Sequence, residues 1–224
     1  MTPFNKFILS ACVSFFSAGP SRCQASNSGP TLPTNKDAIA RIWNISQSMT
    51  DPKMKRALLF IFSDLGAACQ RKQIRRVPRV HGKNGIGETL GDDGKHGGDG
   101  GVLVHGWGPK QEIHISDDEL REQRESLDLI CDDDQMSPAD KACFILDLLV
   151  LTLIHEWVHV WQNGTFAEQR RLECEAYTVQ CFLAGLYLTE VPKYTGAQKD
   201  CTLADAMHGL KEEKCEKAND FCGG

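Results

Sequence analysis

The sequence predicts an α+β protein that is mostly helical, with a small β-sheet, one long buried helix and disulfide staples. Apolar residues recur at helical spacing through most of the chain, and two strand-like segments lie within residues 102–115. The 224 residues include 10 cysteines, with 41% hydrophobic and 25% charged residues. Apart from the cysteines this composition is ordinary for a globular protein, and the length is ample for a real core.

Charge and hydropathy exclude two classes of protein. The net charge of −5 argues against a nucleic-acid partner, because such proteins neutralise phosphates with an excess of Lys and Arg. The longest apolar run, Ala142–Ile154, contains Asp147 and is shorter than the roughly 18 residues of a spanning helix. We therefore expect no membrane span.

The N-terminus is typical of a secretory signal peptide. Lys6 precedes the apolar run Phe7–Phe16, and small and polar residues follow it. Cleavage is expected after Ala25, so residues 1–25 are removed and residues 26–224 form a single domain. Leu9–Cys12 also resembles a bacterial lipoprotein signal, but it lies too close to Lys6 and the apolar run continues beyond it. The protein is expected to be secreted or extracytoplasmic, which means periplasmic in a Gram-negative bacterium.

The cysteines predict disulfides. Cleavage after residue 25 removes Cys12 and Cys23, and the even number that remains predicts up to four disulfides and no free thiol. Cys174 and Cys181 lie on one helix, too far apart to pair, so each should join another segment, and residues 189–224 should form a Cys-containing tail. Without any Cys-x-x-Cys, the cysteines are not expected to bind zinc. The remaining cysteines are Cys69, Cys131, Cys143, Cys174, Cys181, Cys201, Cys215 and Cys222.

Residues 26–80 form the N-terminal helical part. Apolar residues recur at helical spacing from Asn35, and Asp51 followed by Pro52 supplies an N-cap and a first-turn proline for a second helix. The basic stretch Arg71–Arg79 is interpreted as a solvated helix end. An acidic partner and the processing of a pro-segment are the alternatives.

Residues 82–115 combine a glycine-rich loop with a predicted β-hairpin. The loop Gly82–Gly108 is interpreted as a surface loop, with a calcium site as the alternative because it contains Asp92, Asp93 and Asp99. Val102–His105 and Glu112–Ile115 flank the turn Gly106–Pro109, as in a hairpin. Beyond it, Ser116 begins a capping box and a helix that should end near Cys131.

Residues 137–188 are predicted to form a helical hairpin. Ser137 is an N-cap, and the helix that it starts has no breaker before Gln162. Its middle, Phe144–Ile154, is apolar nearly all round, which is typical of a buried helix. A second capping box at Thr165–Glu168 should open the return helix.

The sequence His155-Glu156-Trp157-Val158-His159 lies near the end of the first helix of this hairpin. Two histidines four residues apart share a helical face, about 6 Å apart along the axis, so both can bind one zinc ion. Glu156 lies beside them and is placed to take a proton from a zinc-activated water. Solvation of a helix end does not explain the three groups, because the residues around them are apolar.

A catalytic zinc usually has three protein ligands and one water. The third ligand is expected on the return helix, where Glu173 should lie opposite His155. Glu175 is the alternative, but it lies about 200° further round the helix. His208 is the next residue to consider if neither binds.

The two motifs resemble those of the zincin metallopeptidases, and of the gluzincin group in particular. The second gluzincin motif commonly reads Glu-x-x-Ala-Asp, and Glu173-Cys174-Glu175-Ala176 matches its first four positions, with Tyr177 where the aspartate stands. The resemblance implies a zincin-like fold, Zn²⁺ as cofactor, Glu173 as third ligand and a peptide or protein substrate. It also implies an edge strand that binds extended peptide, for which the Val102–Ile115 hairpin is the candidate.

The predicted function is therefore that of a secreted zinc metallopeptidase. His155, His159 and Glu173 would bind zinc, and Glu156 would act as general base. The alternatives are a non-catalytic secreted binding protein with a structural or degenerate zinc site, and a zinc hydrolase of non-peptide amides. The candidate donors to the transition state are Tyr177, Tyr187, Tyr194 and His208.

Overall fold

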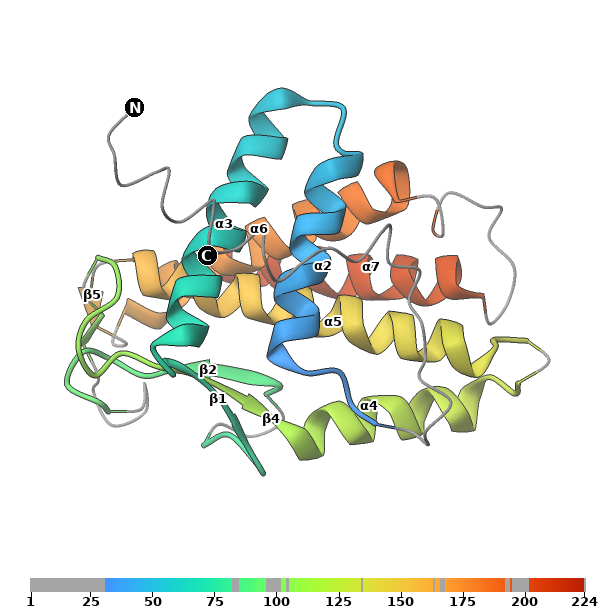
Figure 1. Cartoon of the computed structure of the whole chain (residues 1–224), viewed down its shortest axis with the longest axis horizontal. Coiled ribbons are helices and arrows are strands. Elements are labelled where there is room, and N and C mark those ends of the chain that lie inside the picture. Colours follow the sequence, from blue (N-terminus) through green and yellow to red (C-terminus); the bar gives the residue numbers. More distant parts are fainter. Residues whose placement is uncertain are drawn as a thin grey trace.

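The structure is a computed structural model that describes residues 31–81, 85–95, 102–103, 105–133, 135–162, 164–165, 168–191, 194 and 202–223. Over these residues the chain forms six helices, a three-stranded sheet and a two-stranded sheet (Figure 1). The prediction of a mostly helical protein with a small sheet is confirmed. The predicted signal peptide, residues 1–25, lies outside the described residues.

The first two helices begin where the sequence predicts. Helix α2 (Asn35–Ser48) is capped by Thr34, whose hydroxyl accepts from the amide of Asp37 at 3.2 Å. Helix α3 (Pro52–Gln70) is capped by Asp51, which accepts from two first-turn amides at 2.6 and 3.2 Å. Each cap satisfies amides that have no partner within the helix, which is why these residues start helices.

Helix α5 (Pro138–Trp161) is the centre of the fold. Ser137 caps it, as predicted, and it crosses the molecule with α2 and α3 on one side and α6 on another (Figure 1). By length and hydropathy α5 could cross a bilayer, but 83% of its most apolar window is buried inside the protein. That is the burial of a core helix. Helix α4 (Asp117–Ile130) begins at the predicted cap Ser116 and packs along α5.

The charge inside α5 has a partner on α2. Asp147 is fully buried, and both its oxygens accept from the guanidinium of Arg41, at 2.8 and 3.0 Å. The hydroxyl of Tyr194 donates to the same carboxylate at 2.6 Å. A buried carboxylate is tolerated only when it is paired and hydrogen-bonded in this way.

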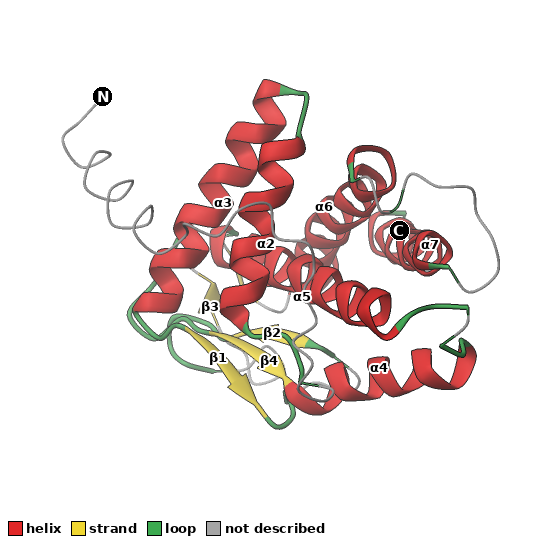
Figure 2. Ribbon diagram, turned by 45° about the vertical axis from the view of Figure 1, so that its right-hand side comes forward, coloured by secondary structure: helices red, strands yellow, loops and turns green. Residues whose placement is uncertain are grey.

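The three-stranded sheet has the order β1 (Ile74–Val77), β4 (Ile113–Ser116), β2 (Gly87–Thr89). β1 is parallel to β4, and β2 is antiparallel to β4, with Glu88 opposite His114. In Figure 2 the sheet lies on one side of α5 and leads directly into α4. β2 is the edge strand that contacts α5.

The predicted hairpin over Val102–Ile115 is wrong. β3 (Val102–Leu103) pairs with β5 (Gly164–Thr165) after the end of α5, and the amide of Gly106 donates to Val160. β4 is instead the middle strand of the other sheet, with its partners well before it in the chain. Alternation within one strand reveals which face is buried, but it does not reveal the partner strands.

The basic stretch is not a solvated helix end either. Helix α3 ends at Gln70, Lys72 adopts a left-handed turn with φ of 62°, and β1 follows. Three arginines of this stretch pair with acids, and the first pair is Arg75 with Glu112 at 2.7 Å. Two more pairs, Arg76 with Asp117 and Arg79 with Glu122, join this stretch to α4.

The last two helices pack against each other. α6 (Gln169–Glu190) begins later than predicted: Thr165 belongs to β5, and Glu168 precedes the helix without a side-chain cap. The expected tail is helix α7 (Leu203–Cys222), which two disulfides join to α6. These are Cys174–Cys222 and Cys181–Cys215, so the prediction that Cys174 and Cys181 pair with another segment is confirmed.

The prediction of no free thiol is contradicted at Cys69. This half-buried residue of α3 has no disulfide, and burial raises the pKa of its thiol. Cys131 and Cys143 are disulfide-bonded, as expected. An even number of cysteines permits complete pairing but does not require it, since a thiol on a packed helix is also stable as a small apolar side chain.

His114 provides a test of the sheet by pH. It lies 3.6 Å from Glu88 on β2 and 2.9 Å from Glu112, and hydrogen bonds to Glu88 and then Glu112 raise its pKa, although partial burial opposes the shift. Because the pKa of His114 is higher in the folded than in the unfolded protein, its protonation stabilises the fold. This stabilisation is complete at pH values below the unfolded-state pKa and is lost as the pH rises through the folded-state pKa.

We therefore expect the wild-type melting temperature to fall between pH 6 and pH 9 more steeply than that of His114→Gln. Over this pH range wild type should lose less than about 1 kcal/mol of stability relative to His114→Gln, because the carboxylates of Glu88 and Glu112 are both partly exposed to solvent. Thermal melts of both proteins across this range measure it. Equal slopes would show that the charge on His114 does not join β2 to β4.

Candidate metal centre

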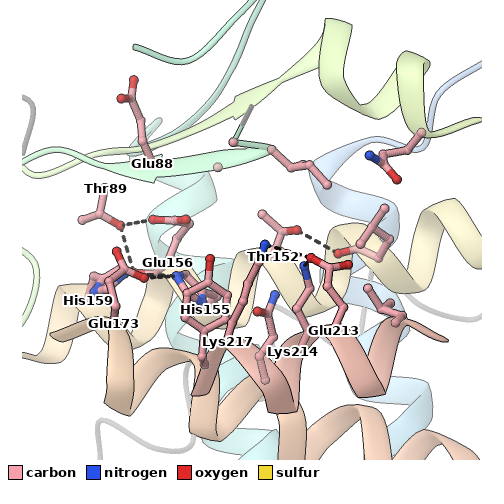
Figure 3. A pocket seen from close by; sticks show the side chains of 18 of the residues that line it. Glu88, Thr89, Thr152, His155, Glu156, His159, Glu173, Glu213, Lys214 and Lys217 are labelled. Carbon is pink, nitrogen blue, oxygen red and sulfur yellow. Dashed lines mark hydrogen bonds and ion pairs between the residues drawn. The ribbon is translucent and has the colours of Figure 1, made fainter. Parts of the chain in front are cut away.

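Helices α5 and α6 bring together the three predicted ligands. Nε2 of His155 and Nε2 of His159 lie 3.2 Å apart, and the carboxylate of Glu173 is 3.3 Å from the first and 3.7 Å from the second (Figure 3). The i, i+4 spacing places both imidazoles on one face, and α6 supplies the carboxylate opposite them. The three ligand atoms lie within 4.8 Å of one another, so the group could hold a metal ion.

The protonation states suit metal binding. His159 is almost completely buried, and burial, followed by the neighbouring His155, lowers its pKa to about 4. Nδ1 of His159 lies 2.8 Å from the side-chain oxygen of Gln162, to which it donates its proton. Nε2 is then unprotonated, and its lone pair points toward Glu173. Burial alone would raise the pKa of Glu173, but the hydrogen bond to His155 and the proximity of His159 lower it.

Gln162 is a site residue that the sequence prediction missed. Its side-chain nitrogen donates to the carbonyl of Leu172 at 2.9 Å and to the carboxylate of Glu175 at 2.8 Å. Glu175 therefore fixes the amide that orients His159 and is not part of the converging ligand group. The available signal was a glutamine three residues after His159, at the C-cap of the same helix.

Tyr177 supports the other histidine by packing. Its ring lies edge-on to that of His155, with centroids 4.6 Å apart, and it stacks on Phe221 at 5.6 Å. Nδ1 of His155 is buried and has no hydrogen-bond partner among the described residues. At this position the aromatic ring restricts the imidazole by contact, where an aspartate would accept its proton.

Glu156 lies beside the metal group, against the edge of the sheet. It is 5% exposed, and burial is the main reason that its pKa rises to about 7. The hydroxyl of Thr89 lies 2.9 Å from its carboxylate and 3.0 Å from its backbone oxygen. A Cβ on Gly87 would come within 2.8 Å of the side chains of Glu156 and Thr152, so only glycine permits this approach of β2.

The metal group opens into a cavity of about 510 Å³ between β2 and helices α4 to α7. Of the four residues proposed as donors to the transition state, Tyr177 is the one that lines this cavity. Tyr194 binds Asp147, Tyr187 packs on Tyr194, and His208 is not a lining residue. The sequence prediction also missed three lining residues of α7, although they form a charged stripe with helical spacing: Glu213, Lys214 and Lys217.

Among the described residues, the cluster of His155, His159 and Glu173 is the one group of three ligand side chains within metal-binding distance. Asp92 and Asp93 of the glycine-rich loop form no such group there, and Asp99 lies outside the described residues.

Comparisons of the chain with protein-family models, with curated proteins and with solved structures find no match. The functional assignment therefore rests on the geometry of the site.

Proposed function

We propose that this protein is a zinc-dependent metallopeptidase of the zincin type. One observation carries the proposal: two imidazole nitrogens and a carboxylate converge at the wall of a cavity, and a second, buried carboxylate lies directly beside them. This is the arrangement that metal-assisted hydrolysis requires, with an open side for the substrate and a base within reach.

The donor set fits zinc. Two ligands that are each 2.0–2.1 Å from a tetrahedral ion lie about 3.3 Å apart. The separations of 3.2 Å between the imidazoles and 3.3 Å between His155 and Glu173 match this value, and 3.7 Å for His159 and Glu173 is slightly wider. Two histidines and one glutamate are a ligand set of catalytic zinc sites, whereas calcium and magnesium prefer oxygen ligands alone.

Glu156 would move the protons. Zinc in such a site supplies a Lewis acid that acidifies water and polarises a carbonyl. The carboxylate of Glu156, with its pKa near 7, can accept a proton from the attacking water and then give it to the leaving amine. The hydroxyl of Thr89, which lies 2.9 Å from it, would hold the carboxylate toward the cavity.

Strand β2 suits an extended peptide as substrate. It is an edge strand of the sheet and lines the cavity together with His155 and Glu156. An extended peptide can add to such an edge through main-chain hydrogen bonds, which would bring its carbonyl groups past the metal centre. The peptide-binding strand that the sequence prediction placed on the hairpin is thus reassigned to Gly87–Thr89.

Two further features favour a secreted catalyst. The disulfides Cys174–Cys222 and Cys181–Cys215 fit an oxidising compartment, in agreement with the proposed signal peptide over residues 1–25. A structural zinc has four protein ligands, whereas three side chains converge in the described part of this chain, next to an open cavity. The catalytic role is therefore favoured over the structural one.

Metal removal tests the proposal. The purified protein should contain about one zinc per chain, and a library of short peptides should be cleaved. A chelator should abolish cleavage and one equivalent of zinc should restore it, because His155, His159 and Glu173 alone cannot activate water. Cleavage that persists after complete removal of zinc would overturn the proposal, as would a zinc-loaded protein that cleaves no peptide.

A further inference from the structure

Helix α7 lines the cavity beside the metal centre. Two disulfides join it to α6, and Cys174, which carries one of them, directly follows the ligand Glu173. The side chains of α7 are therefore held at a fixed place relative to the metal group. Figure 3 shows Lys217, Lys214 and Glu213 next to the group formed by His155, His159 and Glu173.

Two lysines on this wall share one ion-pair partner. One carboxylate oxygen of Glu213 lies 2.8 Å from Nζ of Lys214 and 2.8 Å from Nζ of Lys217. In the described part of the chain neither lysine forms an ion pair with a second carboxylate, although the charge of Lys217 also helps to lower the pKa of Glu173. Lys214 is only 9% exposed, and burial lowers its pKa. A buried ammonium with one partner has donors left for a further acceptor.

A second polar group on the cavity wall also lacks a partner. Gln180 of α6 is 4% exposed and lines the same cavity, and its side-chain oxygen has no hydrogen-bond partner among the described residues. This oxygen is an acceptor, so a substrate N–H, such as a peptide amide beside the carboxylate, would pair with it and recover the free energy that the unmade hydrogen bond costs.

The wall is within reach of a substrate held at the metal. Nζ of Lys217 is 5.5 Å from the ring centroid of Tyr177, and that ring is 4.6 Å from the ring of His155. Together these contacts place Nζ within about 10 Å of the imidazole, which is roughly the span of three residues of extended chain. Phe144, Leu148 and Leu210 add apolar surface to the same cavity.

We infer that the α7 side of the cavity is a subsite for a substrate carboxylate, bound by Lys214 and Lys217 within about three residues of the cleaved bond. The relation to a cleaved bond rests on the proposed peptidase function. The carboxylate subsite itself rests on the two lysines of the cavity wall, whose ammonium groups share one carboxylate oxygen of Glu213 and have donors left for a further acceptor. The carboxylate can be the free C-terminus of a peptide or the side chain of Asp or Glu, and the two sources are distinguished by experiment.

The test uses alanine-rich octapeptides in matched pairs. One pair has a free or an amidated C-terminus, and others have Asp or Asn at single positions. Binding to full-length, zinc-loaded Glu156→Gln protein is measured by calorimetry, and cleavage by wild type is measured in parallel. We expect the carboxylate member of at least one pair to bind about tenfold more tightly. A preference in the first pair identifies the C-terminus, and a preference in the others identifies a side chain.

Variants of α7 connect this preference to the lysines. In the Glu156→Gln background, Lys217→Met should remove most of the tenfold preference, and since Lys217 is partly exposed its replacement should not impair folding. Lys211→Met is the matched control on the same helix, because Lys211 does not line the cavity. Glu213→Gln should change the preference in the opposite direction and increase it, since the competing carboxylate is removed.

Equal binding of carboxylates and amides in every pair would overturn the inference. So would an unchanged preference in Lys217→Met, or a decrease in Glu213→Gln. The peptidase proposal fails separately. If wild type cleaves no peptide but the carboxylate preference and its dependence on Lys217 are present, the subsite is supported and the hydrolytic role is wrong. If wild type cleaves the carboxylate and the amide peptide of every pair equally well, and the two bind equally tightly, the subsite is wrong and the peptidase proposal is supported.

Discussion

A Glu156→Gln variant is expected to keep its zinc and to lose peptide hydrolysis by about 10²–10⁴-fold. Glutamine has nearly the same size and can still accept the hydrogen bond from Thr89, but it cannot take up a proton. The carboxylate is not one of the converging ligand atoms, so the metal site should stay intact. Steady-state kcat on a cleaved peptide, together with the zinc content of the same preparation, measures both effects.

Glu112→Gln is the matched control for this change. It also removes one carboxylate near the sheet, but Glu112 pairs with Arg75 and His114 and does not line the cavity. Its kcat should stay within about twofold of wild type, as expected for a surface ion pair of small energy. If Glu156→Gln retained most of its activity, Glu156 would not be the base. If it lost zinc, Glu156 would act as a ligand.

The residues that the sequence predicted best are those whose interactions are local. Asp51, Ser116 and Ser137 each bind amides two or three residues further along, so a short stretch of sequence is sufficient to identify the caps. The pair His155 and His159 is local in the same sense, because the helix itself fixes their separation. Glu173 could be predicted because only a short connection joins the helix of the two histidines to the return helix, so residues at matching heights on the two helices lie opposite each other.

Long-range pairings could not be predicted from the same patterns. The strand partners of β4 lie up to about forty residues earlier in the chain, and nothing in its alternation of buried residues identifies them. The approach of Gly87 to Glu156 depends on that pairing, since β2 reaches α5 only as the edge of this sheet. The lysines of α7 also reach the cavity only through tertiary packing and two disulfides, which a count of cysteines does not determine.

The distinction between Glu173 and Glu175 is the strongest test of the metal site. The carboxylate of Glu173 lies 3.3 and 3.7 Å from the two imidazoles, whereas that of Glu175 binds the amide of Gln162 at 2.8 Å. On the proposed assignment Glu173→Ala removes a zinc ligand, so the purified protein should be depleted of zinc and inactive. The expected loss of zinc affinity exceeds about a hundredfold, more than replacement of an outer-shell residue usually causes.

Glu175→Ala is the matched variant, two residues away on the same helix and with the same loss of charge. Gln162 would keep its hydrogen bond to the carbonyl of Leu172, so His159 should remain oriented, though less firmly. We expect near-stoichiometric zinc and an affinity about tenfold weaker, at the low end of outer-shell effects. Competition with a chelator measures both affinities, and thermal melts with and without chelator should show a zinc-dependent shift only for Glu175→Ala and wild type. Zinc loss in Glu175→Ala but not in Glu173→Ala would contradict this site geometry, and unchanged affinity in both would mean that α6 supplies no metal ligand.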